Sequence, residues 1–526
     1  MFVHQPTKSL VLKLKDPQRV IDTLGARHAR PLTSPHGNVV VRHSLDVVRV
    51  LRNLGIKSAP SPIAVEYQWP GQFVPYDHQR TMAEAMTIHP RIFNLSEMGT
   101  GKTYAALWAA DYLMKLGQVK RVAILTPLST MHSVWKEDIF KILLHRTCVV
   151  VHGGKEARAK ALAMDVDFYI INHHGIALKD VAMELRKRKD IDLIILDEAS
   201  VFRNHRTNMY RYLVWVMEKV AKRFWVMTGT PTPTEPADAW ALTRLIAPGN
   251  VPIHKGEFER QTMVQVNDRN FPKRGYEKIV YDAMQPAVRF KKSECMDLPP
   301  MTIIPKQTSL SKQQQQAFDA MHDEMMAEIK AGVKITAVHA ADRVNKLRQI
   351  LCGAVLDTDT GKYVALDNSP RLRDLLDTIH EADAKVIVIV PFKGIIRTLE
   401  GQLTSAGISV GVLNGDVTVA QRRTIIHEFK NNTDPHLLLC HPKVMAHGLN
   451  LTEADLLIFY APIYSFDEYA QVIERFNRAG QTRKMTVVRM AAHPMEWSIY
   501  RTLDGRGMTQ QTILDLYEEV TVREAA

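Results

Sequence analysis

Several features that would define a function class are scarce in this chain of 526 residues. Its four cysteines are far apart in the sequence, so neither a CxxC metal site nor a disulfide framework is implied. The longest apolar runs, such as 386–390 and 456–460, are too short to span a bilayer. The first residues do not make a signal peptide. We therefore expect a cytoplasmic protein with free thiols and no membrane partner.

Positive charge, in contrast, is abundant. The formal net charge is +12, and the sequence pI is near 9.3. Hydrophobic residues make up 46% and charged residues 24%, which is ordinary for a globular protein. A chain of this length should hold two or three domains, and its charge favours a polyanionic partner.

The first 68 residues differ from the rest in composition. They contain ten Lys/Arg against four Asp/Glu, and they end in the Pro/Ser-rich link 59–62. Residues 10–14 and 38–41 are typical of strands, and 45–54 have helical apolar spacing. We predict a small α+β domain over residues 1–68. Its basic side chains could contact DNA or form a solvated face, and both interpretations stay open.

Short apolar runs alternate with helical stretches in two further regions, from about residue 72 to 245 and from about 369 onward. Such continuous runs are typical of parallel sheets that are buried on both faces. The predicted strands are 92–95, 121–125, 168–171, 193–196 and 224–227 in the first region, and 386–390, 410–413, 437–439, 456–460 and 486–489 in the second. The segment between the regions has helical spacing at Phe318, Met321, Met325 and Ile329 and again over 337–351.

The stretch from Ser96 to Thr103 predicts a phosphate-binding loop followed by a helix. Its glycines let backbone N–H groups turn toward an anion, and the helix N-terminus favours phosphate. Lys102 supplies a point charge for the outer phosphates, and the Thr103 hydroxyl is suited to Mg²⁺. The general template has a glycine where this chain has Ser96. The residues predicted to bind the nucleotide here are Met98, Gly99, Thr100, Gly101, Lys102 and Thr103.

Three other segments complete the predicted ATP site. Asp197 and Glu198 follow a strand, where doubly wound sheets bind ligands. Asp197 would hold Mg²⁺, and Glu198 would orient or deprotonate the attacking water. The hydroxyl-rich turn at residues 228–232 follows another strand and could sense the γ-phosphate. The Gln79 amide matches the adenine edge because it offers one donor and one acceptor.

The order of these motifs resembles that of the superfamily 2 helicases, and within them the Swi/Snf-type DNA translocase ATPases, most like the compact bacteriophage members. Residues 96–103 match that family's phosphate loop, which also lacks the first glycine. Ser200 stands where the family commonly has histidine. Residues 289–300 resemble its basic segment and Leu-Pro-Pro, and residues 347–350 match its Leu-Arg-Gln-Ile helix. Residues 447–452 and 471–481 resemble its fifth and sixth motifs.

The resemblance implies an α/β fold with two RecA-like parallel-sheet lobes, a helical insertion between them and the small α+β domain. The implied domains are residues 69–250 (first lobe), 251–368 (insertion and linker), 369–495 (second lobe) and 496–526 (C-terminal helix). It further implies ATP and Mg²⁺ as cofactors, with Gly448 and Gln471 at the nucleotide. DNA is the implied partner, duplex, forked or branched, in a bacterial or phage-infected cell. The residues implied to contact DNA are Pro127, Ser129, Asn172, His173, Phe392, Lys393 and Thr452.

A catalytic function for Arg475 and Arg478 also follows from their chemistry, without the family resemblance. Placed three apart on a helix they would face one side, and guanidinium groups suit the charge on a transferring phosphoryl group. From the second lobe they would complete the site on lobe closure. The sequence thus predicts an ATP-driven translocase of double-stranded DNA that could remodel forks or junctions. A strand-separating DNA or RNA helicase and a nucleotide-gated DNA-binding adaptor are the alternatives.

Overall fold

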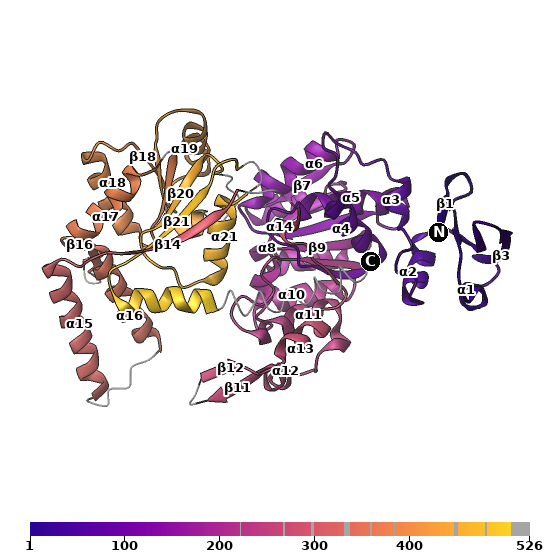
Figure 1. Ribbon diagram of the computed structural model, residues 1–526, viewed down its shortest axis with the longest axis horizontal. Coiled ribbons are helices and arrows are strands. Elements are labelled where there is room, and N and C mark those ends of the chain that lie inside the picture. Colours follow the sequence, from indigo (N-terminus) through magenta and orange to yellow (C-terminus); the bar gives the residue numbers. More distant parts are fainter. Residues whose placement is uncertain are drawn as a thin grey trace. The chain divides into compact units, whose positions relative to one another are not determined.

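The computed structural model describes residues 1–220, 222–266, 269–295, 299–330, 337–357, 360–382, 384–445, 451–478 and 481–505. It divides into two compact units, Met1–Cys295 and Met296–Gly507. Each unit is built around its own parallel sheet (Figure 1). No helix of the described residues is long and apolar enough to cross a membrane.

Unit 1 begins with a small domain whose sheet is antiparallel, in the order β1-β2-β4-β3. The predicted strands 10–14 and 38–41 and the helix 45–54 are confirmed as β2, β4 and α2, whereas β1, α1 and β3 were not predicted. The elements are β1 (Phe2–His4), β2 (Ser9–Leu12), α1 (Pro17–Leu24), β3 (Ala29–Ser34), β4 (Gly37–Arg42), α2 (Leu45–Asn53) and α3 (Pro62–Glu66).

This small domain shares one hydrophobic core with the lobe that follows it. Val48 and Leu51 of α2 are fully buried in the same cluster as Met82 and Met86 of the lobe. The side chain of Arg49 also donates to the carbonyl of Ile88 at 2.7 Å. The small domain is therefore packed onto the first lobe.

The sheet of the first lobe has seven parallel strands in the order β13-β5-β10-β9-β6-β8-β7. Its strands are β5 (Arg91–Asn94), β6 (Arg121–Thr126), β7 (Cys148–Val151), β8 (Phe168–Asn172), β9 (Ile191–Asp197), β10 (Arg223–Met227) and β13 (Ala287–Val288). Its helices are α4 (Asp77–Ile88), α5 (Lys102–Lys115), α6 (Glu137–Ile142), α7 (Lys155–Ala163), α8 (His173–Ile176), α9 (Lys179–Lys187), α10 (Asn208–Met217) and α11 (Ala239–Ile246). All five predicted strands of this lobe are confirmed.

The remainder of unit 1 contains a two-stranded antiparallel hairpin between two helices (Figure 1). These elements are α12 (Lys255–Thr262), β11 (Met263–Val266), β12 (Arg269–Pro272), α13 (Tyr276–Ala283) and α14 (Lys292–Cys295). Because β13 joins the first sheet, the segment after residue 250 contributes a strand to this lobe.

The sheet of unit 2 has six parallel strands in the order β14-β21-β20-β17-β19-β18. Its strands are β14 (Met301–Gln307), β17 (Lys385–Ile389), β18 (Val410–Leu413), β19 (Leu437–Cys440), β20 (Ala454–Phe459) and β21 (Met485–Ala491). Its helices are α15 (Lys312–Lys330), α16 (Ala337–Cys352), α17 (Ser369–His380), α18 (Lys393–Ser405), α19 (Val419–Asn431), α20 (Pro442–Met445) and α21 (Phe466–Phe476), with a further helix over 494–505. A small hairpin, β15 (Ala354–Leu356) and β16 (Tyr363–Ala365), follows α16.

The two parallel sheets confirm the predicted α/β fold class, and the predicted strands of the second lobe are confirmed as β17 to β21. The predicted helices of the inserted segment are α15 and α16, which lie side by side (Figure 1). The segment is less purely helical than predicted, because β14 extends the second sheet at its edge. Met325 and Ile329 lie where no side chains are described, and most of the predicted C-terminal helix lies beyond residue 505.

Candidate nucleotide site

The predicted phosphate loop joins β5 to α5 at the carboxyl edge of the first sheet. Gly99 and Gly101 have φ of +83° and +80°, a left-handed conformation that glycine adopts without strain. Lys102 opens α5 and is buried, and its Nζ donates to the carbonyls of Ser96 at 2.7 Å and Glu97 at 3.0 Å. The ammonium group therefore lies inside the curve of its own loop.

The start of α4 packs directly on this loop. The Gln79 side chain is buried, and its Oε1 accepts from the backbone N–H of Tyr76 at 3.1 Å. A Cβ placed on Gly101 would lie 1.9 Å from Gln79 Nε2, so the amide occupies the space beside the glycine. His78 Nε2 donates to the carbonyl of Thr100 at 2.9 Å. Burial lowers the pKa of His78, which favours the neutral ring.

The acidic pair follows the neighbouring strand β9. Asp197 Oδ2 accepts from Trp135 Nε1 at 2.9 Å and from Thr126 Oγ1 at 3.1 Å, and Oδ1 accepts from the backbone N–H of Glu198 at 3.1 Å. Burial raises the pKa of the Asp197 carboxyl, and the bond from Trp135 and the charge of Lys102 oppose that shift. A divalent cation at this carboxylate would offset the cost of burying its charge.

Glu198 and the turn after β10 complete the edge. Glu198 has a φ of +48°, a conformation that costs a non-glycine residue about 1–3 kcal/mol and that persists where the surroundings hold it. The backbone N–H of Thr228 donates to the carbonyl of Asn94 at 3.1 Å. A Cβ on Gly229 would lie 3.5 Å from the backbone nitrogen of Met98. The turn and the phosphate loop are therefore in direct contact.

The segment after β13 fixes the other side of the loop. The backbone N–H of Phe290 donates to Ser96 Oγ at 3.1 Å, and that of Lys292 donates to Glu97 Oε2 at 2.9 Å. Arg289, which is 1% exposed, lies 3.5 Å from the other carboxylate oxygen of Glu97. Ser96 thus has a structural function at the position where the general template has glycine.

Two family models match this chain. The model described as SNF2-related domain matches residues 92–354, and the helicase conserved C-terminal domain matches residues 369–480. The chain belongs to the SNF2-related family. Its SNF2-related domain is followed by the helicase conserved C-terminal domain.

Relatives of this SNF2-related chain are similar over most of its length. An uncharacterized ATP-dependent helicase of Mycoplasma genitalium is 26% identical over 75% of this chain and 37% of its own length. The protein p41 of Acyrthosiphon pisum secondary endosymbiont phage 1 is 23% identical over 86% of this chain and 99% of its own length. The SWI2/SNF2 ATPase core of Sulfolobus solfataricus in complex with dsDNA is 18% identical, covers 87% of this chain and 97% of its own, and has a TM-score of 0.42. The chain spans just over a third of the first two curated relatives.

The sequence predicted that the two arginines of the sixth SNF2 motif lie on one helix. The structure shows that they do not. Helix α21 carries Gln471 and Arg475, but it ends at Phe476, two residues before Arg478, whose carbonyl accepts from the backbone N–H of Gln481 at 3.1 Å. The helix ends because Asn477 leaves the helical region, with φ of −89° and ψ of 87°. Gln481 is buried, and its Nε2 donates to the carbonyl of Ala454 at 2.8 Å. Gly448 of the fifth motif lies outside the described residues.

The residues predicted to contact DNA differ in exposure. His173 is buried, and its Nε2 donates to the carbonyl of Asp197 at 2.8 Å. Its side chain therefore lies against the backbone of the acidic pair. The other predictions fall on partly accessible positions: Pro127, Ser129, Asn172, Phe392 and Thr452 are half-buried, and Lys393 is exposed. Lys393 lies 2.5 Å from Asp416, and this bond lowers the pKa of Asp416.

Sequence reasoning missed the function of Trp135. Its side chain is fully buried, and its Nε1 donates to Asp197 Oδ2 at 2.9 Å. Met131, Trp135, Ile139 and Ile142 are all buried and recur at helical spacing. That apolar stripe was a signal that Trp135 faces the interior.

Proposed function

We propose that this chain hydrolyses ATP to drive movement along double-stranded DNA. The observation that carries the proposal is the contact of several motif segments on one phosphate loop within unit 1. The Gln79 amide lies beside Gly101, His78 bonds to the loop, and the turn at Gly229 packs on Met98. The match to the SNF2-related domain and to the helicase conserved C-terminal domain supports the same proposal.

The residues present fit ATP and Mg²⁺. The loop turns at two left-handed glycines, and a divalent cation would offset the cost of burying the Asp197 carboxylate charge. Thr103 and Asp197 would hold Mg²⁺, which when bound would neutralise charge on the phosphoryl oxygens. Lys102 would exchange its loop carbonyls for the outer phosphates, and Glu198 would orient the attacking water. Gln79 and Gln471 are proposed to contact the nucleotide. Gly448 of the fifth motif is proposed to contact it as well.

We further propose that Arg475 and Arg478 stabilise negative charge on the transferring phosphoryl group. Arginine suits this function because its guanidinium group stays charged and forms paired hydrogen bonds with oxyanions. Alanine variants at either position are expected to bind ATP and to lose turnover.

DNA contact is proposed for the partly accessible motif residues Pro127, Ser129, Asn172, Phe392, Lys393 and Thr452. Contacts to phosphates do not depend on sequence, and they weaken at higher salt because the release of counterions from DNA becomes less favourable. The positive net charge supports such a partner. Remodelling of forks or junctions is a further proposal that a comparison of DNA structures would decide.

The test is the ATPase rate of the full chain against duplex, single-stranded, forked and four-way DNA and RNA, at one salt concentration. We expect duplex-containing DNA to stimulate turnover, and Lys102→Ala or Glu198→Gln to reduce it by at least about 100-fold, in the range of single catalytic groups. Exposed Lys278→Ala is the matched control and should leave the rate unchanged. Unaltered turnover in either site variant would contradict the catalytic assignment, and stimulation by single strands or RNA alone would favour a strand-separating helicase.

A further inference from the structure

Residues 126–135 form a segment with two distinct faces. It starts at the last residue of β6 and continues into a π-helix, Met131–Lys136. Residues of one face are buried in the lobe, namely Thr126, Thr130, Met131 and Trp135. Residues of the other face are exposed, namely Leu128, His132 and Ser133. Pro127 and Ser129, proposed above to contact DNA, belong to this same segment.

The buried face bonds directly to the Asp197 carboxylate. Trp135 Nε1 and Thr126 Oγ1 both donate to Oδ2, at 2.9 Å and 3.1 Å. Thr130 Oγ1 lies 2.7 Å from the Thr126 hydroxyl and extends the network into the loop. Two donors on one oxygen fix the rotation of the carboxylate, and hydrogen bonds to a charged, buried acceptor are strong.

The backbone of the segment is also unusual. A π-helix is rare, and where it occurs it is commonly retained at functional positions. Here it places Trp135 against Asp197 while it leaves His132 and Ser133 accessible. A small shift of the exposed face would therefore move the indole that holds the carboxylate.

We propose that Trp135 is a positioning residue that couples bound DNA to the orientation of Asp197. DNA held on the outer face of residues 127–133 sets the position of the π-helix, and the indole N–H transmits that position to the carboxylate predicted to hold Mg²⁺. This inference rests on the proposed function. It assigns a function to a fully buried tryptophan that lies six residues after Ser129.

The first test uses binding in the absence of DNA. Trp135→Phe keeps an aromatic ring and removes the N–H donor. Calorimetric titration with ADP, with and without Mg²⁺, should show that the affinity gained from Mg²⁺ falls about tenfold, the effect of losing one hydrogen bond to a charged group. The control is Trp108→Phe, because Trp108 is equally buried but donates to the carbonyl of Pro70 at 3.0 Å. Trp108→Phe should retain the full gain in ADP affinity from Mg²⁺.

The second test measures the ratio of ATPase rates with and without duplex DNA. Trp135→Phe should lose most of the stimulation while the thermal unfolding midpoint stays within the range of Trp108→Phe. Thr126→Val should behave like Trp135→Phe, and Thr126→Ser, which keeps the hydroxyl, should restore the ratio. An unchanged Mg²⁺ gain and an unchanged ratio in Trp135→Phe would overturn the inference. A wild-type protein that DNA does not stimulate would instead contradict the proposed function.

Discussion

Gly101 shows how closely single residues of the phosphate loop are constrained. Its φ is +80°, and the Gln79 amide fills the space where a side chain would begin. The same amide is the group proposed to read adenine. Any side chain at residue 101 would therefore disturb two parts of the nucleotide site together.

Gly101→Ala should weaken ATP binding by at least about tenfold, because the methyl group must displace Gln79, at a cost of roughly 1.4 kcal/mol or more. Gly117 is the matched control: it follows the same helix with φ of +68°, and a Cβ added there would have open space for 4 Å around it. Gly117→Ala should cost about 1 kcal/mol of stability and leave the affinity for ATP unchanged. Equal affinities in both variants, measured with a fluorescent ATP analogue, would contradict this prediction.

At this scale the sequence predicts which residues carry charge and hydroxyl groups, but not which neighbours they bond. The short motifs locate Lys102 and Asp197 because phosphate and metal chemistry require those groups at those spacings. The burial of His173 and Trp135 against Asp197 depends on strands β6, β8 and β9 lying side by side. That contact comes from the sheet order, which no local pattern contains.

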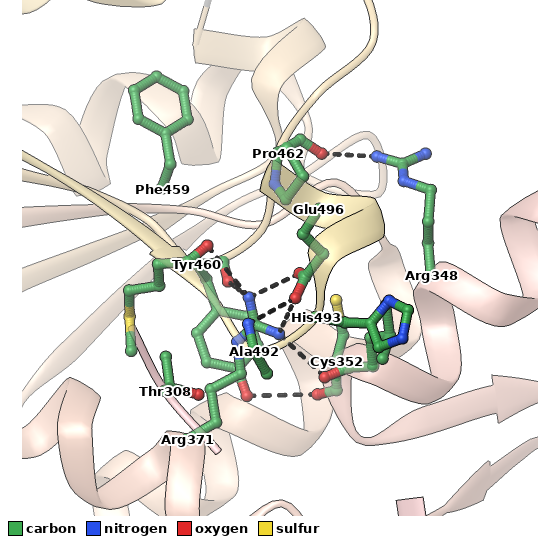
Figure 2. A network of polar contacts seen from close by, with 12 residues as sticks. Thr308, Arg348, Cys352, Arg371, Phe459, Tyr460, Pro462, Ala492, His493 and Glu496 are labelled. Carbon is green, nitrogen blue, oxygen red and sulfur yellow. Dashed lines mark hydrogen bonds and ion pairs between the residues drawn. The ribbon is translucent and has the colours of Figure 1, made fainter. Parts of the chain in front are cut away.

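Among the elements, α16 and α17 are tied to the second sheet by one buried network (Figure 2). Arg371 of α17 is fully buried and pairs with Glu496 at 2.8 Å. It also donates to the carbonyls of Leu351, Tyr460 and Met490. Nearby, Arg348 of α16 donates to the carbonyl of Pro462 at 2.6 Å and stacks between the rings of Phe392 and Tyr464. The inserted helix is therefore joined to the start of α18.

Arg371→Met should destabilise unit 2 by about 3–5 kcal/mol, because it leaves the Glu496 carboxylate buried without its partner. Adding Glu496→Leu should recover part of that loss, although the carbonyls of Leu351, Tyr460 and Met490 still lose the guanidinium donor. Hydrogen exchange in peptides of β20 and β21 measures the effect locally. Arg397→Ala removes an exposed pair with Asp416 and should cost less than about 1 kcal/mol. A loss of similar size in both single variants would show that burial does not decide the strength of the pair.

The interior strands of the two parallel sheets were predicted, whereas of the described edge strands only β18 was, for a physical reason. Strands such as β9 are buried on both faces and read as continuous apolar runs. Strand β14 is an edge strand whose residues are mostly exposed and include Pro305, and β13 has only two residues. Neither carries the apolar signal. The end of α21 before Arg478 was missed because Asn477 is a weak stop signal.

For the whole molecule, the core shared by α2 and α4 changes how the N-terminal domain should be tested. Deleting residues 1–68 would remove part of the buried cluster that contains Met82 and Met86 of α4. Loss of activity after such a deletion would report unfolding as readily as loss of DNA contact. Charge-reversal of its exposed basic residues is the cleaner experiment, since it leaves the core intact.

Movement along duplex DNA is the central claim, and displacement of a third strand measures it most directly. A duplex that carries a short triplex-forming strand is incubated with the full chain and ATP, and release of each strand is followed. We predict ATP-dependent release of the third strand with the duplex left intact, and no release with Glu198→Gln. Separation of the duplex strands, or release without ATP hydrolysis, would contradict the account.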